Sequence, residues 1–119
     1  MAETTRWDAV PREQVSDLIG RRMIYGEKVM LVRWEFAKGC YVASHRHPNE
    51  QVAVVESGNL RMVIDGEETV LTGGDVRVIP PNTPHDAEAI EDTVVIDIFS
   101  PPREDFLSGD GPGYLTRGR

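Results

Sequence analysis

The heptapeptide His-Arg-His-Pro-Asn-Glu-Gln at residues 45–51 decides how we interpret the rest of this chain. Side chains alternate between the two faces of an extended chain, so His45 and His47 point the same way. Imidazole is the metal ligand that proteins use most often. The third and last histidine of the sequence, His85, follows a proline-rich turn far downstream. A metal site therefore requires a fold that brings His85 and one more donor to this pair.

Short segments with alternating apolar and polar residues lie on both sides of the heptapeptide. In the clearest one, Met30, Val32, Trp34 and Phe36 share one face. The dipeptide Asp65-Gly66 predicts a tight type I′ hairpin. Together the patterns predict nine or ten short strands and no long helix. The strands are expected at about 21–25, 29–36, 40–44, 51–55, 60–64, 69–71, 76–79, 85–90 and 93–99. Such regular spacing predicts an all-β sandwich or barrel.

The two ends of the chain are less regular than its middle. Residues 1–20 are expected to form an N-terminal arm, either with a short helix that begins at Pro11 or with a loop and an edge strand. Residues 21–107 form the expected barrel. Residues 108–119 are rich in glycine and are expected to be a flexible C-terminal tail. The N-terminus lacks the apolar run of a signal peptide, which predicts a cytoplasmic protein.

Composition narrows the possible partners. The chain has 119 residues, enough for one domain, and 39% apolar with 28% charged residues is typical of globular proteins. The net charge of −7 argues against nucleic acid and anionic membranes as partners. It allows a small acidic molecule that is bound by a local cation. Cys40 is the single cysteine, which excludes an internal disulfide and predicts a small buried side chain.

Two sequence blocks resemble the paired motifs of the cupin superfamily, whose fold is a double-stranded β-helix or jelly-roll barrel. The first block is Gly39-x5-His45-x-His47-x3-Gln51-x6-Gly58. The second is Gly74-x5-Pro80, with His85 five residues after the proline. The resemblance implies one divalent metal ion inside the barrel, held by His45, His47, Gln51 and His85.

The motifs depart from the family pattern at three positions. Gln51 stands where the family has an acidic ligand, Asn82 replaces a glycine and Ala89 replaces an asparagine. Asn tolerates the left-handed backbone that glycine favours. Glu50 is the alternative to Gln51 as the fourth ligand, although Gln51 keeps the motif spacing. Three imidazoles and an amide suit Zn, Ni, Fe, Co or Mn, and their neutrality favours a Lewis acid over redox chemistry.

The last predicted strand carries a carboxylate among apolar residues, because alternation puts Val95, Asp97 and Phe99 on one face. If this face lines the barrel, burial raises the pKa of Asp97 and suits it to acid–base catalysis. The alternative is an outward Asp97 paired with an arginine. Residues 97–106 resemble the ending of pectin-degradation cupins that linearise and ketonise 4,5-unsaturated uronates. That resemblance implies that Asp97 transfers the proton and Phe99 shapes the pocket.

Arg103 belongs to the same ending. We expect it either to clamp a substrate carboxylate through a bidentate pair or to lie on the surface at a helix start. The leading functional hypothesis is a metal-dependent lyase or isomerase for a small hydroxy or keto acid, most concretely an unsaturated uronate. The alternatives are a cupin dioxygenase, a polyketide-type cyclase and a non-catalytic module that binds metal or a sugar acid. The resemblance also implies a homodimer that pairs through an edge strand, and open sheet edges need covering in any case.

Overall fold

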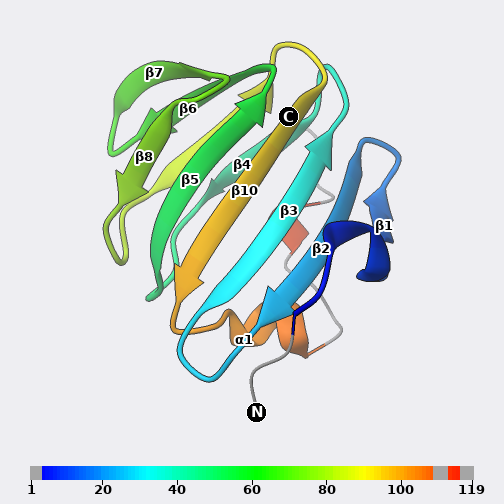
Figure 1. The fold of residues 1–119 in the computed structure, drawn as a ribbon. Coiled ribbons are helices and arrows are strands. Elements are labelled where there is room, and N and C mark those ends of the chain that lie inside the picture. Colours follow the sequence, from blue (N-terminus) through cyan, green and yellow to red (C-terminus); the bar gives the residue numbers. More distant parts are fainter. Residues whose placement is uncertain (1–3, 109–112, 116–119) are drawn as a thin grey trace.

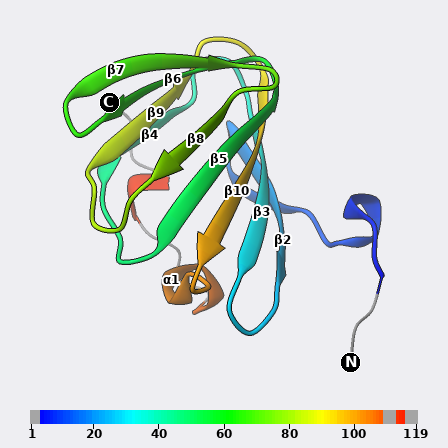
Figure 2. The same cartoon turned by 60° about the vertical axis from the view of Figure 1, so that its left-hand side comes forward.

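The strands pair into two antiparallel sheets that face each other, as Figures 1 and 2 show. This computed structural model describes residues 4–108 and 113–115. One sheet has six strands in the order β1-β2-β3-β10-β5-β8, and the other has four in the order β4-β9-β6-β7. The strands are β1 (Glu13–Ser16), β2 (Ile19–Tyr25), β3 (Met30–Phe36), β4 (Tyr41–His45), β5 (Glu50–Ser57), β6 (Asn59–Ile64), β7 (Glu67–Thr72), β8 (Val76–Ile79), β9 (His85–Ala89) and β10 (Thr93–Ser100). The predicted double-stranded β-helix is confirmed.

The N-terminal segment contains an edge strand after a short 3-10 turn, η1 (Trp7–Ala9). β1 pairs antiparallel with β2, and Glu13 lies opposite Arg21. The helix that Pro11 could have opened is therefore wrong, and the edge-strand alternative holds. The reason is tertiary: the free edge of β2 offers unpaired backbone groups, and pairing with it satisfies them.

The core lies between the sheets, where the alternation of the strands places it. In β3, Met30, Val32, Trp34 and Phe36 are all buried, as predicted. In β10, Val95, Asp97 and Phe99 are buried on the same inner side. The face that carries Asp97 therefore lines the barrel interior, and the alternative of an outward Asp97 is wrong.

Two turns show why particular residues are needed at strand connections. Asp65 and Gly66 have φ angles of 49° and 83°, which confirms the predicted type I′ hairpin between β6 and β7. Gly58, between β5 and β6, has a φ of 95°, and a Cβ atom there would lie 2.5 Å from the carbonyl oxygen of Asp92. Asn82 takes the left-handed conformation, with a φ of 61°.

The end of the chain closes one end of the barrel. After β10 come helix α1 (Glu104–Leu107) and the 3-10 segment η2 (Gly113–Leu115), and Figure 2 shows η2 (red) between the sheets. Tyr114 and Leu115 are buried, so the expected flexible tail is wrong for these two residues. Gly109, Gly111, Pro112 and Gly118 of that expected tail lie outside the described residues. None of the described helices is long and apolar enough to cross a membrane.

Candidate metal centre

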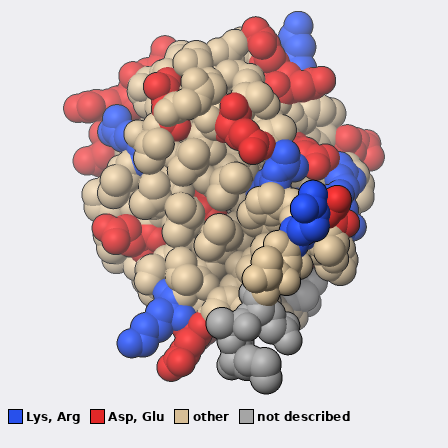
Figure 3. All heavy atoms as spheres, viewed as in Figure 1, with Lys and Arg blue, Asp and Glu red and all other residues tan. Residues whose placement is uncertain are grey.

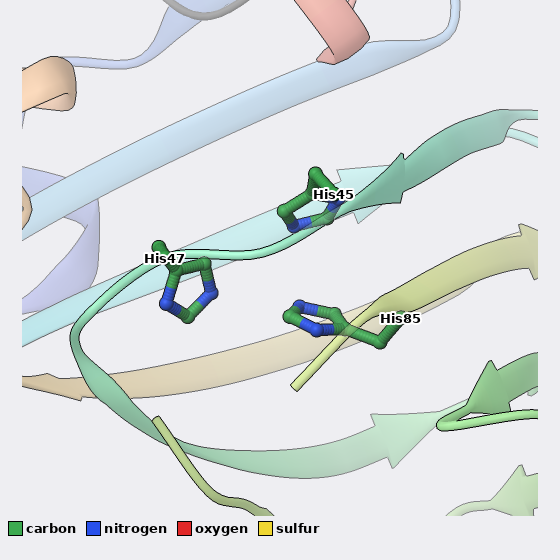
Figure 4. Close-up of side chains that lie close together, drawn as sticks. All are labelled: His45, His47 and His85. Atoms are coloured by element: carbon green, nitrogen blue, oxygen red, sulfur yellow. The ribbon is translucent and has the colours of Figure 1, made fainter. Parts of the chain in front are cut away.

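Three histidines converge inside the barrel, as Figure 4 shows. His45 ends β4 and His85 begins β9, and the two are direct partners across this strand pair. His47 follows in the loop that leads to β5. One ring nitrogen of each histidine lies within 4.8 Å of the others. The fold thus brings His85 to the 45/47 pair, as the sequence predicted.

Each imidazole is oriented by the main chain two residues away. The Nδ1 atoms of His45, His47 and His85 lie 2.8, 3.0 and 2.7 Å from backbone carbonyl oxygens. Those oxygens belong to Ala43, Asn49 and Thr83, respectively. A carbonyl can only accept, so Nδ1 carries the proton and donates it. The Nε2 atom of each neutral ring is then left with a free lone pair, as a metal ligand needs.

The contacts of the Nε2 atoms fit a metal ion. The Nε2 atom of His85 is buried and has no hydrogen-bond partner. The Nε2 atom of His47 lies 3.1 Å from Oε1 of Gln51. With Nδ1 protonated, both of these atoms are acceptors, and two acceptors at this distance repel unless a cation binds both. The donor set therefore fits a divalent cation.

Burial keeps the three imidazoles neutral. It lowers the pKa of His45 to about 3, and the neighbouring His85 adds to the effect. Burial also lowers the pKa of His47 to about 4, helped by the charge of Arg103, and it lowers the pKa of His85. At neutral pH no proton has to leave a ring before a metal binds.

Gln51, and not Glu50, points its side chain toward the three histidines. Gln51 is 5% exposed on the inner face of β5, whereas Glu50 is exposed on the opposite face. Neighbouring residues of a strand point to opposite faces, so Glu50 and Gln51 cannot both face the histidines. The donors His45, His47, His85 and Gln51 are all uncharged, so a divalent ion bound among them would keep its full charge.

Asp97 lies in the same cavity with its carboxylate buried. Trp34 donates a hydrogen bond from Nε1 to Oδ2 of Asp97, at 2.9 Å, and the other oxygen, Oδ1, has no such bond. Burial raises the pKa of Asp97 to about 6, although the nearby Gln51 and Trp34 side chains oppose this rise. A carboxyl group with this pKa can accept or release a proton near neutral pH.

Phe99 and Arg103 complete one wall of the cavity. Phe99 packs edge-on against His47, with ring centroids 5.5 Å apart. Arg103 is 2% exposed and lies over the ring of Phe106, so its predicted alternative as a surface residue is wrong. Its Nε and Nη2 atoms donate to the two carboxylate oxygens of Asp105, at 2.9 and 2.5 Å. The bidentate pair that we expected between Arg103 and a substrate carboxylate is therefore formed with Asp105 instead.

A small cavity, with about 40 Å³ of free volume, connects these groups. Its wall contains His45, His85, Gln51, Asp97, Phe99 and Arg103, together with apolar core residues and Tyr114. The sequence missed Tyr114 and the role of Trp34. An aromatic-aliphatic pair, Tyr114-Leu115, inside a glycine-rich segment is the signal that could have revealed the first.

Several other polar and aromatic side chains of the strands lie away from the cavity. Arg33 and Arg61 pair with glutamates on the outer strand faces, and Arg77 does not line the cavity. Tyr41 donates its hydroxyl proton to Asp86 at 3.1 Å. Cys40 is buried, as expected, and burial raises the pKa of its thiol to about 11. Among the described arginines and lysines, Arg103 alone lines the cavity.

A family profile and a similar protein sequence both relate this chain to the cupins. The sequence profile of the cupin domain matches residues 32–99. The chain is 38% identical over 103 residues to the pectin degradation protein KdgF of Dickeya dadantii, covering 84% of this chain and 94% of that protein.

Two crystal structures share both the fold and a substantial part of the sequence. An RmlC-like cupin from Shewanella frigidimarina is 32% identical, with a TM-score of 0.84 over 89% of this chain and 96% of that one. KdgF from a Halomonas species is 30% identical, with a TM-score of 0.84 over 89% of this chain and 99% of that one.

Proposed function

Because this chain belongs to the cupin domain family, we propose that it is a metal-dependent enzyme that opens and ketonises 4,5-unsaturated uronates. The observation that carries the proposal is the buried carboxylate of Asp97, with a pKa of about 6, in a cavity lined by two imidazoles, His45 and His85, of the cluster of three. Two relatives of similar length, one of them named a pectin degradation protein, support the substrate class.

The reaction is an isomerisation, so no atom is gained or lost. The hydroxyl group on C1 gives up its proton and the bond between C1 and the ring oxygen breaks, which leaves an aldehyde at C1. The C4–C5 double bond then belongs to an enol. C4 accepts a proton while C5 becomes a ketone. The reaction therefore needs one group that takes the proton from the C1 hydroxyl group and delivers a proton to C4.

Asp97 is suited to this transfer. Its ionised form can take the proton from the C1 hydroxyl group, and its protonated form can deliver a proton to C4. Trp34 holds Oδ2 through its hydrogen bond and leaves Oδ1, which has no partner, as the atom for the proton. Phe99 lies beside His47 and excludes water from this side of the cavity.

His45, His47, His85 and Gln51 would hold the metal ion. When bound, a divalent ion there supplies Lewis acidity, which polarises hydroxyl and carboxylate oxygens. Arg103 gives the cavity a permanent positive charge, because its contacts with Asp105 and Tyr114 outweigh burial and raise its pKa. Both features favour an acidic ligand.

The test is an assay on 4,5-unsaturated galacturonate, in which the ultraviolet absorbance of the conjugated enol ether disappears as the ring opens. We expect the absorbance to fall with metal-loaded protein, to persist after chelation and to fall again when metal is restored. Metal analysis of the purified protein identifies the ion. Consumption of oxygen with a phenolic or thiol substrate, without loss of the uronate, would contradict the proposal and favour a dioxygenase.

We also propose that the protein is a homodimer, formed through the outer face of the six-stranded sheet. A row of aliphatic side chains crosses four hydrogen-bonded strand pairs on this face: Val78, Val52, Ile98, Leu31 and Ile24. Figure 3 shows this central surface largely free of charge, with most charged residues towards its rim. Two chains that each carry a net charge of −7 repel, so an uncharged face favours a second copy.

A further inference from the structure

We propose that Tyr114 is an intramolecular competitor for the acid-binding end of the cavity, which an acidic ligand must displace. The inference takes its ligand class, a sugar acid, from the proposed function. Tyr114 lies outside the two sequence motifs and outside the segment that the cupin profile matches.

The side chain of Tyr114 makes contact with both groups that an acidic ligand needs. Its ring stacks on the imidazole of His45, with centroids 3.7 Å apart and planes 5° apart. Its hydroxyl oxygen accepts a hydrogen bond from Nη2 of Arg103. Asp105 accepts from Nε and from the same Nη2 atom but does not line the cavity, so the contact with Tyr114 is the one that a ligand inside the cavity can replace.

The size of the cavity argues that the ring cannot stay where it is. About 40 Å³ of free volume has room for a few water molecules at most. Pockets for small molecules typically hold about 300–1,000 Å³. Most of the other wall residues lie on strands of the two sheets, whereas Tyr114, like Leu115, comes from the short segment η2. Movement of this side chain is therefore the simplest way to make room beside Arg103.

The phenol group also resembles part of the ligand that would replace it. A phenol ring stacked on an imidazole occupies the space of a sugar ring, and its oxygen accepts from Arg103 as a carboxylate oxygen would. A buried guanidinium group needs such an acceptor at all times. Tyr114 supplies the acceptor while the cavity is empty, and the ligand supplies it when it binds.

A competitor of this kind lowers the apparent affinity of every ligand by the fraction of molecules in the open state. Calorimetric titration of metal-loaded protein with galacturonate measures this affinity. Y114F keeps the ring and removes the hydroxyl group, and we expect its Kd to fall about tenfold, the value of one hydrogen bond to a charged group. Y114A removes the ring too and should lower Kd further. Y41F removes a hydroxyl group from the outer barrel wall and should leave Kd unchanged.

A second measurement follows the side chain itself. In protein labelled with fluorotyrosine, the fluorine resonance that is missing from Y114F belongs to Tyr114, and saturation with galacturonate should shift it. Weaker binding in both Tyr114 variants would mean that the ring is a wall that touches the ligand, and would overturn the proposal. So would the absence of galacturonate binding in all variants. Neither measurement depends on turnover. A protein that is inactive on unsaturated uronates can therefore still confirm the role of Tyr114, which separates this proposal from the proposed function.

Discussion

In the proposed reaction, proton transfer depends on a single residue, Asp97. Substitution by asparagine keeps the shape and the acceptor for Trp34 but removes the proton-transferring group. We expect D97N to lose about 10²–10⁴-fold in turnover of 4,5-unsaturated galacturonate, followed by ultraviolet absorbance. The metal content and the affinity for galacturonate should not change. Equal turnover of the two proteins would show that Asp97 carries no proton.

The same residue affects stability in the metal-free protein. Its pKa is raised from 3.8 to about 6 on folding, so its contribution to stability is fully present below about pH 4 and lost as pH rises through 6. D97N has no such group. The stability of D97N relative to wild type should therefore improve by about 2.4 kcal/mol between pH 4 and pH 7.5. Urea unfolding at both pH values measures this difference, and an unchanged difference would contradict the raised pKa.

The lowered pKa values of the histidines predict how metal binding depends on protons. At pH 6, three imidazoles with the ordinary pKa of 6.5 would release about two protons in total when a metal binds. Here the rings are already neutral, with the pKa of His45 at about 3 and that of His47 at about 4. We expect a release below about half a proton. Calorimetry with zinc in two buffers of different ionisation enthalpy gives the number, and a release near two would contradict this expectation.

The positions of these site residues were easier to predict from the sequence than their hydrogen-bond partners. The motif resemblance predicted that His45, His47 and His85 lie together. Alternation put Asp97 on one face with Val95 and Phe99 but left open whether that face lines the interior. The hydrogen bond from Trp34 to Asp97 joins residues 63 apart in the sequence, and no local pattern encodes it. The pairing of Arg103 with Asp105 could not be predicted either, because the same guanidinium group could equally bind the carboxylate of a ligand.

At the scale of elements, the turn between β5 and β6 depends on a glycine. A Cβ atom at Gly58 would meet the backbone of Asp92 and Thr93 at 2.5–2.7 Å, and the φ of 95° is strained for other residues. We expect G58A to destabilise the fold by about 3 kcal/mol or more, measured by thermal or urea unfolding.

Gly66 provides the matched control for this turn. Its φ is 83°, but a Cβ atom there would meet nothing within 4 Å. G66A therefore carries only the backbone cost of a left-handed residue, about 1 kcal/mol. Similar losses in the two variants would mean that the close approach to Asp92 does not matter.

The two ends of the chain show where prediction of elements from sequence fails. β1 is four residues long and has no strong alternation, so only the open edge of β2 determines its structure. Tyr114 and Leu115 stand in a segment of glycine and polar residues, and their burial depends on the open end of a barrel formed by distant strands. In the middle of the chain, by contrast, strands such as β3 and β10 carry their inner face as a clear alternation in the sequence.

At the scale of the whole molecule, the proposed dimer gives a further prediction. Val78 is 54% exposed at the edge of the aliphatic row on the six-stranded sheet. Light scattering after size exclusion should give twice the mass of one chain for the wild type and the mass of one chain for V78K. A lysine that is buried in the interface without a partner destabilises the dimer. V70K changes an equally exposed valine on the other sheet and should remain a dimer. A monomeric wild type would overturn the proposed interface.

The anchoring of each imidazole to a carbonyl group two residues away also matters for redesign. Backbone atoms fix one edge of each ring, in addition to the contacts of His45 with Tyr114 and of His47 with Phe99. Aliphatic residues that line the remaining space, such as Leu60, Met62 and Ala87, can therefore be exchanged without tilting the rings. Substrate preference could therefore be redesigned at these three positions with other apolar side chains of similar volume, while the orientation of the imidazoles is kept.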